Sequence, residues 1–201
     1  KKEYKPDATQ SAYRALRNRV LSFLAYQDSA LIAKIQATSA QNMTDQLSAF
    51  SIVIKHNPNS EHIKLFYDQW KHERLVIDKW FSAQVLTAHP NSLTKVVKNL
   101  TTHSDFTIKT PNRVRSIFGA FSANTAGFHL ETGENYKLFS DWILKVDPVN
   151  PQVAARMCSA FETWKRYDSK RQKLIKSQIN RVLGAVSVSK DTREMLTKLI
   201  D

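Results

Sequence analysis

Residues 135–164 read NYKLFSDWILKVDPVNPQVAARMCSAFETW, and this stretch decides the fold class. Its first half carries four apolar residues at steps of three and four positions: Tyr136, Phe139, Ile143 and Val146. Its second half repeats that spacing with Val153, Met157, Phe161 and Trp164. Such steps place side chains on one face of a helix. Between the stripes, Asn150-Pro151 joins a helix-capping side chain to a proline suited to the first helical position. The stretch therefore predicts two helices with a sharp break between them.

The same periodicity extends over most of the chain. Further stripes include Tyr13/Leu16/Val20/Phe23, Met43/Leu47/Phe50/Ile54, Leu93/Val96/Leu100, Val114/Ile117/Phe121 and Leu174/Ile175/Ile179/Val182/Leu183. No convincing alternating strand pattern interrupts them. Helices are expected to begin near residues 8, 28, 43, 60, 73, 92, 111, 135, 151, 169 and 190. Because a helix pair then takes roughly 35–40 residues, the pattern is typical of helical repeats.

The predicted architecture is all-α: a solenoid or superhelix of roughly 10–12 antiparallel stacked helices, similar to HEAT or armadillo repeats. We expect residues 1–201 to form a single domain, with residues 1–7 as a linker or frayed start. The segment 122–133 contains two glycines and is expected to be a loop. Helix caps are predicted at Asn42, Ser60, Ser92 and Thr110, and Gly184 is predicted to end a helix.

Composition sets the class of protein. The 201 residues carry 30 Lys+Arg against 18 Asp+Glu, a formal net charge of +12, with 42% hydrophobic residues. This is globular composition, and its excess charge favours an anionic partner or solubility alone. A single cysteine excludes an internal disulfide, and no apolar run reaches the roughly 20 residues of a membrane span. The opening Lys1-Lys2-Glu3-Tyr4 has no Met or signal region, so we expect a fragment of a longer protein. The single cysteine favours a location in the cytoplasm.

The sequence offers little intrinsic catalytic chemistry. No two of the six histidines are four residues apart, so no helix presents a His pair to a metal. Most of them are expected at the surface or at helix ends. Cys158 lies inside an apolar stripe, which favours a small buried core residue over a nucleophile. The four glycines form no phosphate-binding loop, and we expect no catalytic, cofactor or metal residues in this chain.

Basic residues are concentrated in the interval 165–181, which contains Lys165, Arg166, Lys170, Arg171, Lys173, Lys176 and Arg181. A solvated helix surface is the simplest interpretation. A nucleic-acid surface would need cations aligned on one face with exposed aromatics, and here the aromatics lie mainly in the apolar stripes. In a third interpretation, selected arginines line a cavity and bind a carboxylate.

Several segments resemble the C-terminal helical domain of bacterial aminopeptidase N, a zinc-dependent gluzincin of the membrane-alanyl aminopeptidase family. They are Asn42-Met43-Thr44-Asp45, the stretch 75–81 (LVIDKWF), the stretch 111–121 (PNRVRSIFGAF) with Phe128-His129, the stretch 150–156 (NPQVAAR) and the stretch 165–172 (KRYDSKRQ). These blocks follow the family's order and extend from about residue 10 to the end of the chain. The first few residues and the connection 55–62 are not diagnostic.

The resemblance implies a noncatalytic domain of an enzyme that removes N-terminal amino acids from peptides. The zinc ligands and the amine-recognition segment of such enzymes lie in a separate catalytic domain, so zinc is implied there and not in this chain. The helical domain would cap the active site and shape the chamber through which peptides enter. The implied partners are the catalytic domain of the same polypeptide and peptide substrates, with neither a membrane nor nucleic acid expected.

The resemblance also singles out four residues. Arg115 and Arg156 are candidates for the substrate channel, where a cation attracts a peptide's C-terminal carboxylate or acidic side chains. An internal salt bridge is the alternative for each. Asn112 and Arg113 are candidates for a cap or for interdomain contact, and within 165–172 we expect Tyr167 to pack and Asp168 to cap the next helix. The hypothesis predicts an exposed docking face for the catalytic domain, and its alternative is a helical-repeat module that binds nucleic acid or protein.

Overall fold

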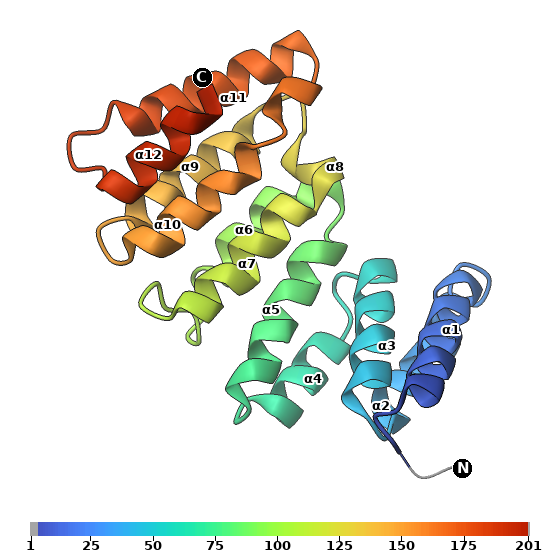
Figure 1. Ribbon diagram of the computed structural model, residues 1–201. Coiled ribbons are helices and arrows are strands. Elements are labelled where there is room, and N and C mark those ends of the chain that lie inside the picture. Colours follow the sequence, from blue (N-terminus) through green and yellow to red (C-terminus); the bar gives the residue numbers. More distant parts are fainter. Residues whose placement is uncertain (1–3, 201) are drawn as a thin grey trace. The chain divides into compact units, whose positions relative to one another are not determined.

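The computed structural model describes residues 4–200. Over this range the chain forms twelve α-helices and three short 3-10 helices, without a strand, which confirms the all-α prediction (Figure 1). The chain divides into two compact units, residues 1–87 (unit 1) and residues 88–201 (unit 2). No helix among residues 4–200 combines the length and apolar character needed to cross a membrane.

Unit 1 holds the first five helices: α1(Ala8–Leu24), α2(Leu31–Ser39), α3(Met43–His56), α4(His62–Trp70) and α5(Arg74–Thr87). Asp7 begins α1 by accepting a 2.7 Å hydrogen bond from the Gln10 amide. Of the predicted linker 1–7, residues 4–7 are irregular, and residues 1–3 lie outside the described residues. Asn42 caps α3 as predicted, because its Oδ1 accepts the Asp45 amide at 3.0 Å.

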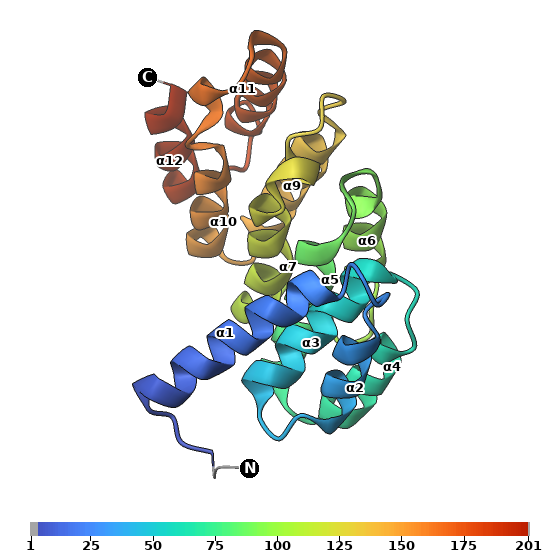
Figure 2. The same ribbon diagram turned by 90° about the vertical axis from the view of Figure 1, so that its right-hand side faces the viewer.

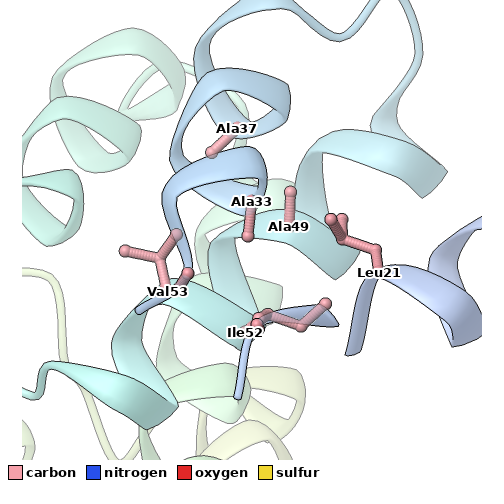
Figure 3. Packing of buried hydrophobic residues seen from close by; sticks show 8 residues of the cluster. Leu21, Ala33, Ala37, Ala49, Ile52 and Val53 are labelled. Carbon is pink, nitrogen blue, oxygen red and sulfur yellow. The ribbon is translucent and has the colours of Figure 1, made fainter. Parts of the chain in front are cut away.

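Small side chains form the core where α1, α2 and α3 meet. Leu21 of α1 packs with Ala33 and Ala37 of α2 and with Ala49 and Val53 of α3 (Figure 3). The carboxylate of Asp45 is also buried: it accepts a hydrogen bond from Asn18 Nδ2 at 2.9 Å and forms an ion pair with the exposed Arg17. The inner side of α1 is thus partly polar.

The apolar stripe of α1 faces solvent in this chain, although it has the predicted helical spacing. Tyr13, Leu16, Val20 and Phe23 are 67%, 64%, 46% and 61% exposed. Two aromatic residues of this stripe, Tyr13 and Phe23, are therefore exposed and not part of the core. The reason is that Arg14, Asn18 and Leu21 occupy the inner face instead.

Unit 2 holds the remaining elements: η1(Pro90–Ser92), α6(Leu93–Leu100), α7(Pro111–Ala123), α8(Thr125–Phe128), α9(Glu134–Val146), α10(Pro151–Cys158), η2(Ser159–Phe161), η3(Trp164–Arg166), α11(Ser169–Leu183) and α12(Lys190–Ile200). Helices α9, α10, α11 and α12 lie side by side (Figures 1 and 2). The core of unit 2 includes four fully buried phenylalanines, from α7, α8, α9 and η2, with ring centroids of neighbouring pairs 5.2–6.2 Å apart: Phe121, Phe128, Phe139 and Phe161.

The ends of the helices in unit 2 test the predicted caps. Asn150 and Asp168 cap α10 and α11, each accepting a backbone amide at 3.0 Å, as predicted. Gly184 ends α11. Thr110 and Ser92 hold the N-cap positions of α7 and α6 without a side-chain cap bond, so for them the predicted capping chemistry is wrong.

Ser60 is predicted to cap a helix and lies in unit 1. At the start of α4 the N-cap residue is Glu61, and the Ser60 hydroxyl accepts the His62 amide at 3.3 Å.

The segment 122–133 is more structured than the expected loop. It contains the end of α7 and the short helix α8, which Asn124 caps by accepting the Gly127 amide at 3.2 Å. The Asn124 amide group also donates to the Ala88 carbonyl at 2.9 Å. Gly133 follows in the left-handed region, with φ +70°, and this conformation starts α9.

Candidate functional site: a cationic groove in unit 2

Unit 2 contains a groove of about 460 Å³ between α7 and α10. Its α7 wall consists of Arg115, Phe118, Gly119, Ser122 and Ala123, and its α10–η2 wall of Val153, Arg156, Met157, Ser159 and Ala160. Thr125, His129, Phe139, Thr163 and Tyr167 complete the lining. The groove is apolar at its base, with Phe118, Phe139 and Val153 all buried.

Helical spacing explains why these side chains share one groove. Arg115, Gly119 and Ser122 follow each other by four and three residues on α7, so they lie on one face. Arg156 and Ala160 are related in the same way on the α10 side. Helices α7 and α10 pack against each other, and this brings together arginines that are 41 residues apart in sequence.

The two predicted channel arginines thus line the same groove. Both are exposed. Arg115 Nη1 donates to Asn112 Oδ1 at 3.3 Å. Within residues 4–200 neither Arg115 nor Arg156 has a carboxylate within 4.0 Å, in contrast to Arg171 and Arg181 of the same unit. A guanidinium group without an internal carboxylate is available to an anionic ligand.

Gly119 is one of the residues that line the groove on its α7 wall. It lies in the interior of α7, where glycine costs about 0.5–1 kcal/mol relative to alanine. A Cβ at this position would meet nothing within 4 Å, so packing does not require a glycine here.

The wall formed by His129 is fixed by aromatic contacts. Its ring stacks on Tyr167 with centroids 3.9 Å apart, and its Nδ1 is 2.9 Å from the Tyr136 hydroxyl. Burial, with a smaller contribution from the Arg171 charge, lowers the pKa of His129 to about 4. Burial also raises the pKa of Tyr136 to about 12. At neutral pH both groups are uncharged, so the positive charge of the groove comes from the arginines.

Arg171 of α11 connects the backbone of His129 to two carboxylates. Its Nε donates to the His129 carbonyl at 2.7 Å, and its guanidinium group pairs with Asp168 at 2.5 Å and with Glu131 at 3.6 Å. The backbone and side-chain hydrogen bonds from Arg171 hold the pKa of Asp168 below its usual value. The packing of Tyr167 and the capping by Asp168 agree with the expectations for residues 165–172.

The other two predicted residues lie beside the groove. Asn112 is the second residue of α7, and its Oδ1 accepts the bond from Arg115. Arg113 is buried, and its Nη1 donates to the Asp105 carbonyl. Arg113 therefore ties the segment before α7 to the helix.

Among residues 4–200, neither a reactive thiol nor a metal centre accompanies the groove. Cys158 is fully buried, as predicted, and burial raises the pKa of its thiol to about 12. No group of three His, Cys, Asp or Glu side chains in this range is placed to hold a metal ion.

The basic interval 165–181 is partly neutralised. Lys170 and Arg171 pair with Glu131, and Arg181 pairs with Asp141 at 2.7 Å. Burial acts to raise the pKa of Asp141, but hydrogen bonds from Lys137 and Arg181 keep it below its usual value. These pairs fit the interpretation of this interval as a solvated helix surface.

Sequence reasoning missed Gly119 as part of the site. Its signal was present: a glycine in the interior of a predicted helix, four residues after Arg115. The stack of His129 on Tyr167 left no such signal, because the two residues belong to different elements and meet only through packing.

The chain is similar to known proteins over nearly its whole length. Residues 1–201 match the family described as "Domain of unknown function (DUF3458_C) ARM repeats". The chain is 36% identical to aminopeptidase N of Escherichia coli (strain K12) and 34% identical to aminopeptidase N of Haemophilus influenzae, in each case over 98% of this chain and 23% of the relative. A crystal structure of Legionella pneumophila aminopeptidase A in complex with aspartic acid matches with a TM-score of 0.91, 30% identity and coverage of 100% of this chain and 25% of that one.

The description as ARM repeats confirms the predicted helical-repeat class. The chain spans about a quarter of the length of the curated relatives it matches. Most of the length of those relatives therefore lies outside the segment that this chain matches.

Proposed function

The chain belongs to the DUF3458_C ARM-repeat family, and we propose from its similarity to aminopeptidases that it is the noncatalytic C-terminal domain of a zinc-dependent aminopeptidase. The parent enzyme removes N-terminal amino acids from peptides, and its zinc is held in a catalytic domain outside these residues. The helical domain caps the active site and shapes the chamber through which peptides enter. Its partners are that catalytic domain and the peptide substrates.

One observation carries the chamber role: Arg115 and Arg156 line the same groove, and neither is paired with a carboxylate among residues 4–200. A peptide bound for N-terminal cleavage has its C-terminal carboxylate at the far end. Two guanidinium groups above an apolar base suit a carboxylate attached to an apolar side chain. The groove would thus attract and orient the trailing end of the substrate.

The experiment uses the whole enzyme with the double substitution Arg115→Gln/Arg156→Gln. Three substrates are compared: a tetrapeptide with a free C-terminal carboxylate, the same peptide amidated, and an amino-acyl reporter without a peptide tail. We expect kcat/KM to fall roughly 3–10-fold for the carboxylate peptide, as for the loss of exposed charge pairs. The amidated peptide and the reporter are expected to keep their wild-type values.

The matched control is Arg166→Gln/Lys173→Gln. It removes two positive charges from exposed positions of the same unit that do not line the groove. If the control pair had the same effect, the net charge and not the groove would be responsible. An equal loss on all three substrates would contradict the chamber role, and so would unchanged kinetics.

A second test addresses the noncatalytic assignment. The 201-residue chain supplied with zinc is expected to release no amino acid from peptides, while the whole enzyme does so. Peptidase activity of the chain alone that a zinc chelator abolishes would contradict the proposal.

A further inference from the structure

The imidazole of His129 is held in the wall of the groove from several sides. The His129 amide donates to the Thr125 carbonyl at 3.1 Å, and the His129 carbonyl accepts Arg171 Nε at 2.7 Å. One face of the ring stacks on Tyr167, with centroids 3.9 Å apart, and Nδ1 is 2.9 Å from the Tyr136 hydroxyl. The ring cannot turn without losing this stack and this hydrogen bond, so its second nitrogen, Nε2, has a fixed position.

Tyr136 decides which ring nitrogen of His129 carries the proton. Tyr136 is fully buried, and among residues 4–200 its hydroxyl forms a hydrogen bond with His129 Nδ1 alone. With the proton on Nδ1, the imidazole would donate to the hydroxyl oxygen and leave the hydroxyl proton buried without an acceptor. With the proton on Nε2, the hydroxyl donates to Nδ1 and both groups are satisfied. The hydrogen-bond network therefore assigns the proton of the neutral ring to Nε2.

The Nε2–H group of His129 is available to a molecule in the groove. It donates no hydrogen bond to any of the described residues. It is not buried either, because the buried side-chain nitrogen and oxygen atoms without a partner in residues 4–200 are Asp28 Oδ1 and Ser140 Oγ. Since His129 lines the groove, the open edge of its ring is accessible from there.

Other polar side chains of the groove offer a different chemistry. Three hydroxyls of the lining donate to backbone carbonyls two or three residues earlier in the chain: those of Ser122, Thr125 and Ser159. The hydroxyls of Thr163 and Tyr167 can donate or accept, and the two arginines are charged. Burial keeps His129 uncharged at neutral pH by lowering its pKa to about 4. His129 thus adds a fixed, uncharged group that can only donate.

We propose that His129 is a specificity-determining residue: its Nε2–H donates to the carbonyl oxygen of the last peptide bond of a substrate that ends in an apolar residue. This rests on the proposed function, in which Arg115 and Arg156 attract the C-terminal carboxylate. The carbonyl of the preceding residue lies next to that carboxylate and is an uncharged acceptor, which suits an uncharged donor. The terminal side chain packs on the buried Phe118 and Phe139, and their apolar surroundings strengthen the hydrogen bond.

The test replaces one atom of the substrate and uses the whole enzyme. Two tetrapeptides ending in leucine are compared, one with an ordinary last peptide bond and one in which the oxygen of that bond is sulfur, a weaker acceptor. The bond that is cleaved is the same in both. For the wild type we expect the thioamide to lower kcat/KM about 2–10-fold, as for the loss of a neutral hydrogen bond.

The informative variant is His129→Phe/Tyr136→Phe, in which the two peptides are expected to give equal kcat/KM. This variant removes the donor together with its buried partner, so it keeps both rings and leaves no hydroxyl unpaired. Because each variant is judged by its ratio between two peptides, a general effect on the enzyme cancels.

Tyr167→Phe is the matched control, since it removes a hydroxyl from the other ring of the stack and should keep the wild-type ratio. Three results would each overturn the proposal. They are a ratio of one in the wild type, an unchanged ratio in His129→Phe/Tyr136→Phe, and a lost ratio in Tyr167→Phe.

A second measurement does not depend on activity. Solid-state ¹⁵N NMR of the full-length enzyme labelled at histidine shows which ring nitrogen carries the proton, and the His129 signals are those missing from His129→Phe/Tyr136→Phe. We expect a protonated Nε2 at neutral pH, and a proton on Nδ1 would contradict the proposal.

The two proposals fail separately. Unchanged kinetics in Arg115→Gln/Arg156→Gln refute the proposed chamber role, whatever proton position the NMR spectrum shows. If that variant behaves as expected while the wild type treats both tetrapeptides alike, only the role of His129 is refuted.

Discussion

The ring of His129 and the hydroxyl of Tyr136 share a hydrogen bond of 2.9 Å, at the point where the wall of the groove joins the core of unit 2. Tyr136 is fully buried, and the lowered pKa of His129 keeps its imidazole neutral at pH 7. In the tautomer with its proton on Nε2, the imidazole accepts the hydrogen bond of the Tyr136 hydroxyl at Nδ1. Protonation of His129 would remove this acceptor and place a charge next to Arg171.

Acid is therefore expected to destabilise the chain through His129. The pKa of the folded state, about 4, is below the ordinary value of 6.5, so the unfolded state binds the proton first as the pH falls. This contribution to stability is complete above about pH 6.5 and is lost as the pH falls from about 6.5 towards 4. Between pH 7 and pH 5 we expect a loss of about 1–2 kcal/mol, measured by urea unfolding.

His129→Gln keeps an acceptor for Tyr136 but cannot titrate, so its stability should depend less on pH over this range. His72→Gln, at an exposed position, is the control and should behave like the wild type. An unaltered pH dependence in His129→Gln would show that other groups are responsible.

A buried carboxylate joins the end of α9 to the start of α12. Asp147 accepts the hydroxyls of Ser189 and Thr192 at 2.5 Å each and the Ser189 amide at 2.7 Å. We expect Asp147→Ala to lower the free energy of unfolding by about 3 kcal/mol, because it leaves buried donors without an acceptor. Thr192→Val should cost about 1 kcal/mol, whereas Thr197→Val on the exposed face of α12 should cost less than about 0.5 kcal/mol. Equal losses in the two threonine variants would contradict this account.

Gly119→Ala is expected to stabilise the chain. The added methyl group meets nothing within 4 Å, and alanine is the better helix former by about 0.5–1 kcal/mol. Denaturant unfolding measures the gain. Gly127→Ala is the contrasting variant, because its Cβ would lie 2.6 Å from Leu93 Cδ2, and it should destabilise. If Gly119→Ala also destabilised, the empty space at this position would be disproved.

The thiol of Cys158 is expected to react with a disulfide reagent only after unfolding. It is fully buried, its pKa is raised to about 12, and its Sγ contacts the Ala154 carbonyl at 3.3 Å. At pH 8 we expect labelling at least about a hundredfold slower than for a cysteine placed at the fully exposed Val186 in a Cys158→Ser background. Comparable rates in the folded state would contradict the burial.

The sequence alone determined the local structure. The stripe from Tyr136 to Val146 lies in one helix, α9, and the next helix, α10, begins at Pro151, as predicted. Six predicted starts coincide with the first residues of helices: residues 8, 43, 111, 151, 169 and 190. Helical spacing and capping depend on residues only a few positions apart, so both can be recognised in the sequence of one or two helical turns. Arg115 and Arg156 were singled out by resemblance, and spacing alone would not have linked them.

Tertiary structure decided the rest, since it depends on which helices pack together. The spacing of the α1 stripe predicts a helix face but not what covers it, and in this chain Tyr13 and Phe23 are exposed while Arg14 and Asn18 are buried. The groove exists because α7 and α10, separated by α8 and α9 in sequence, lie against each other. A periodic sequence specifies faces, and only the packed chain specifies which faces meet.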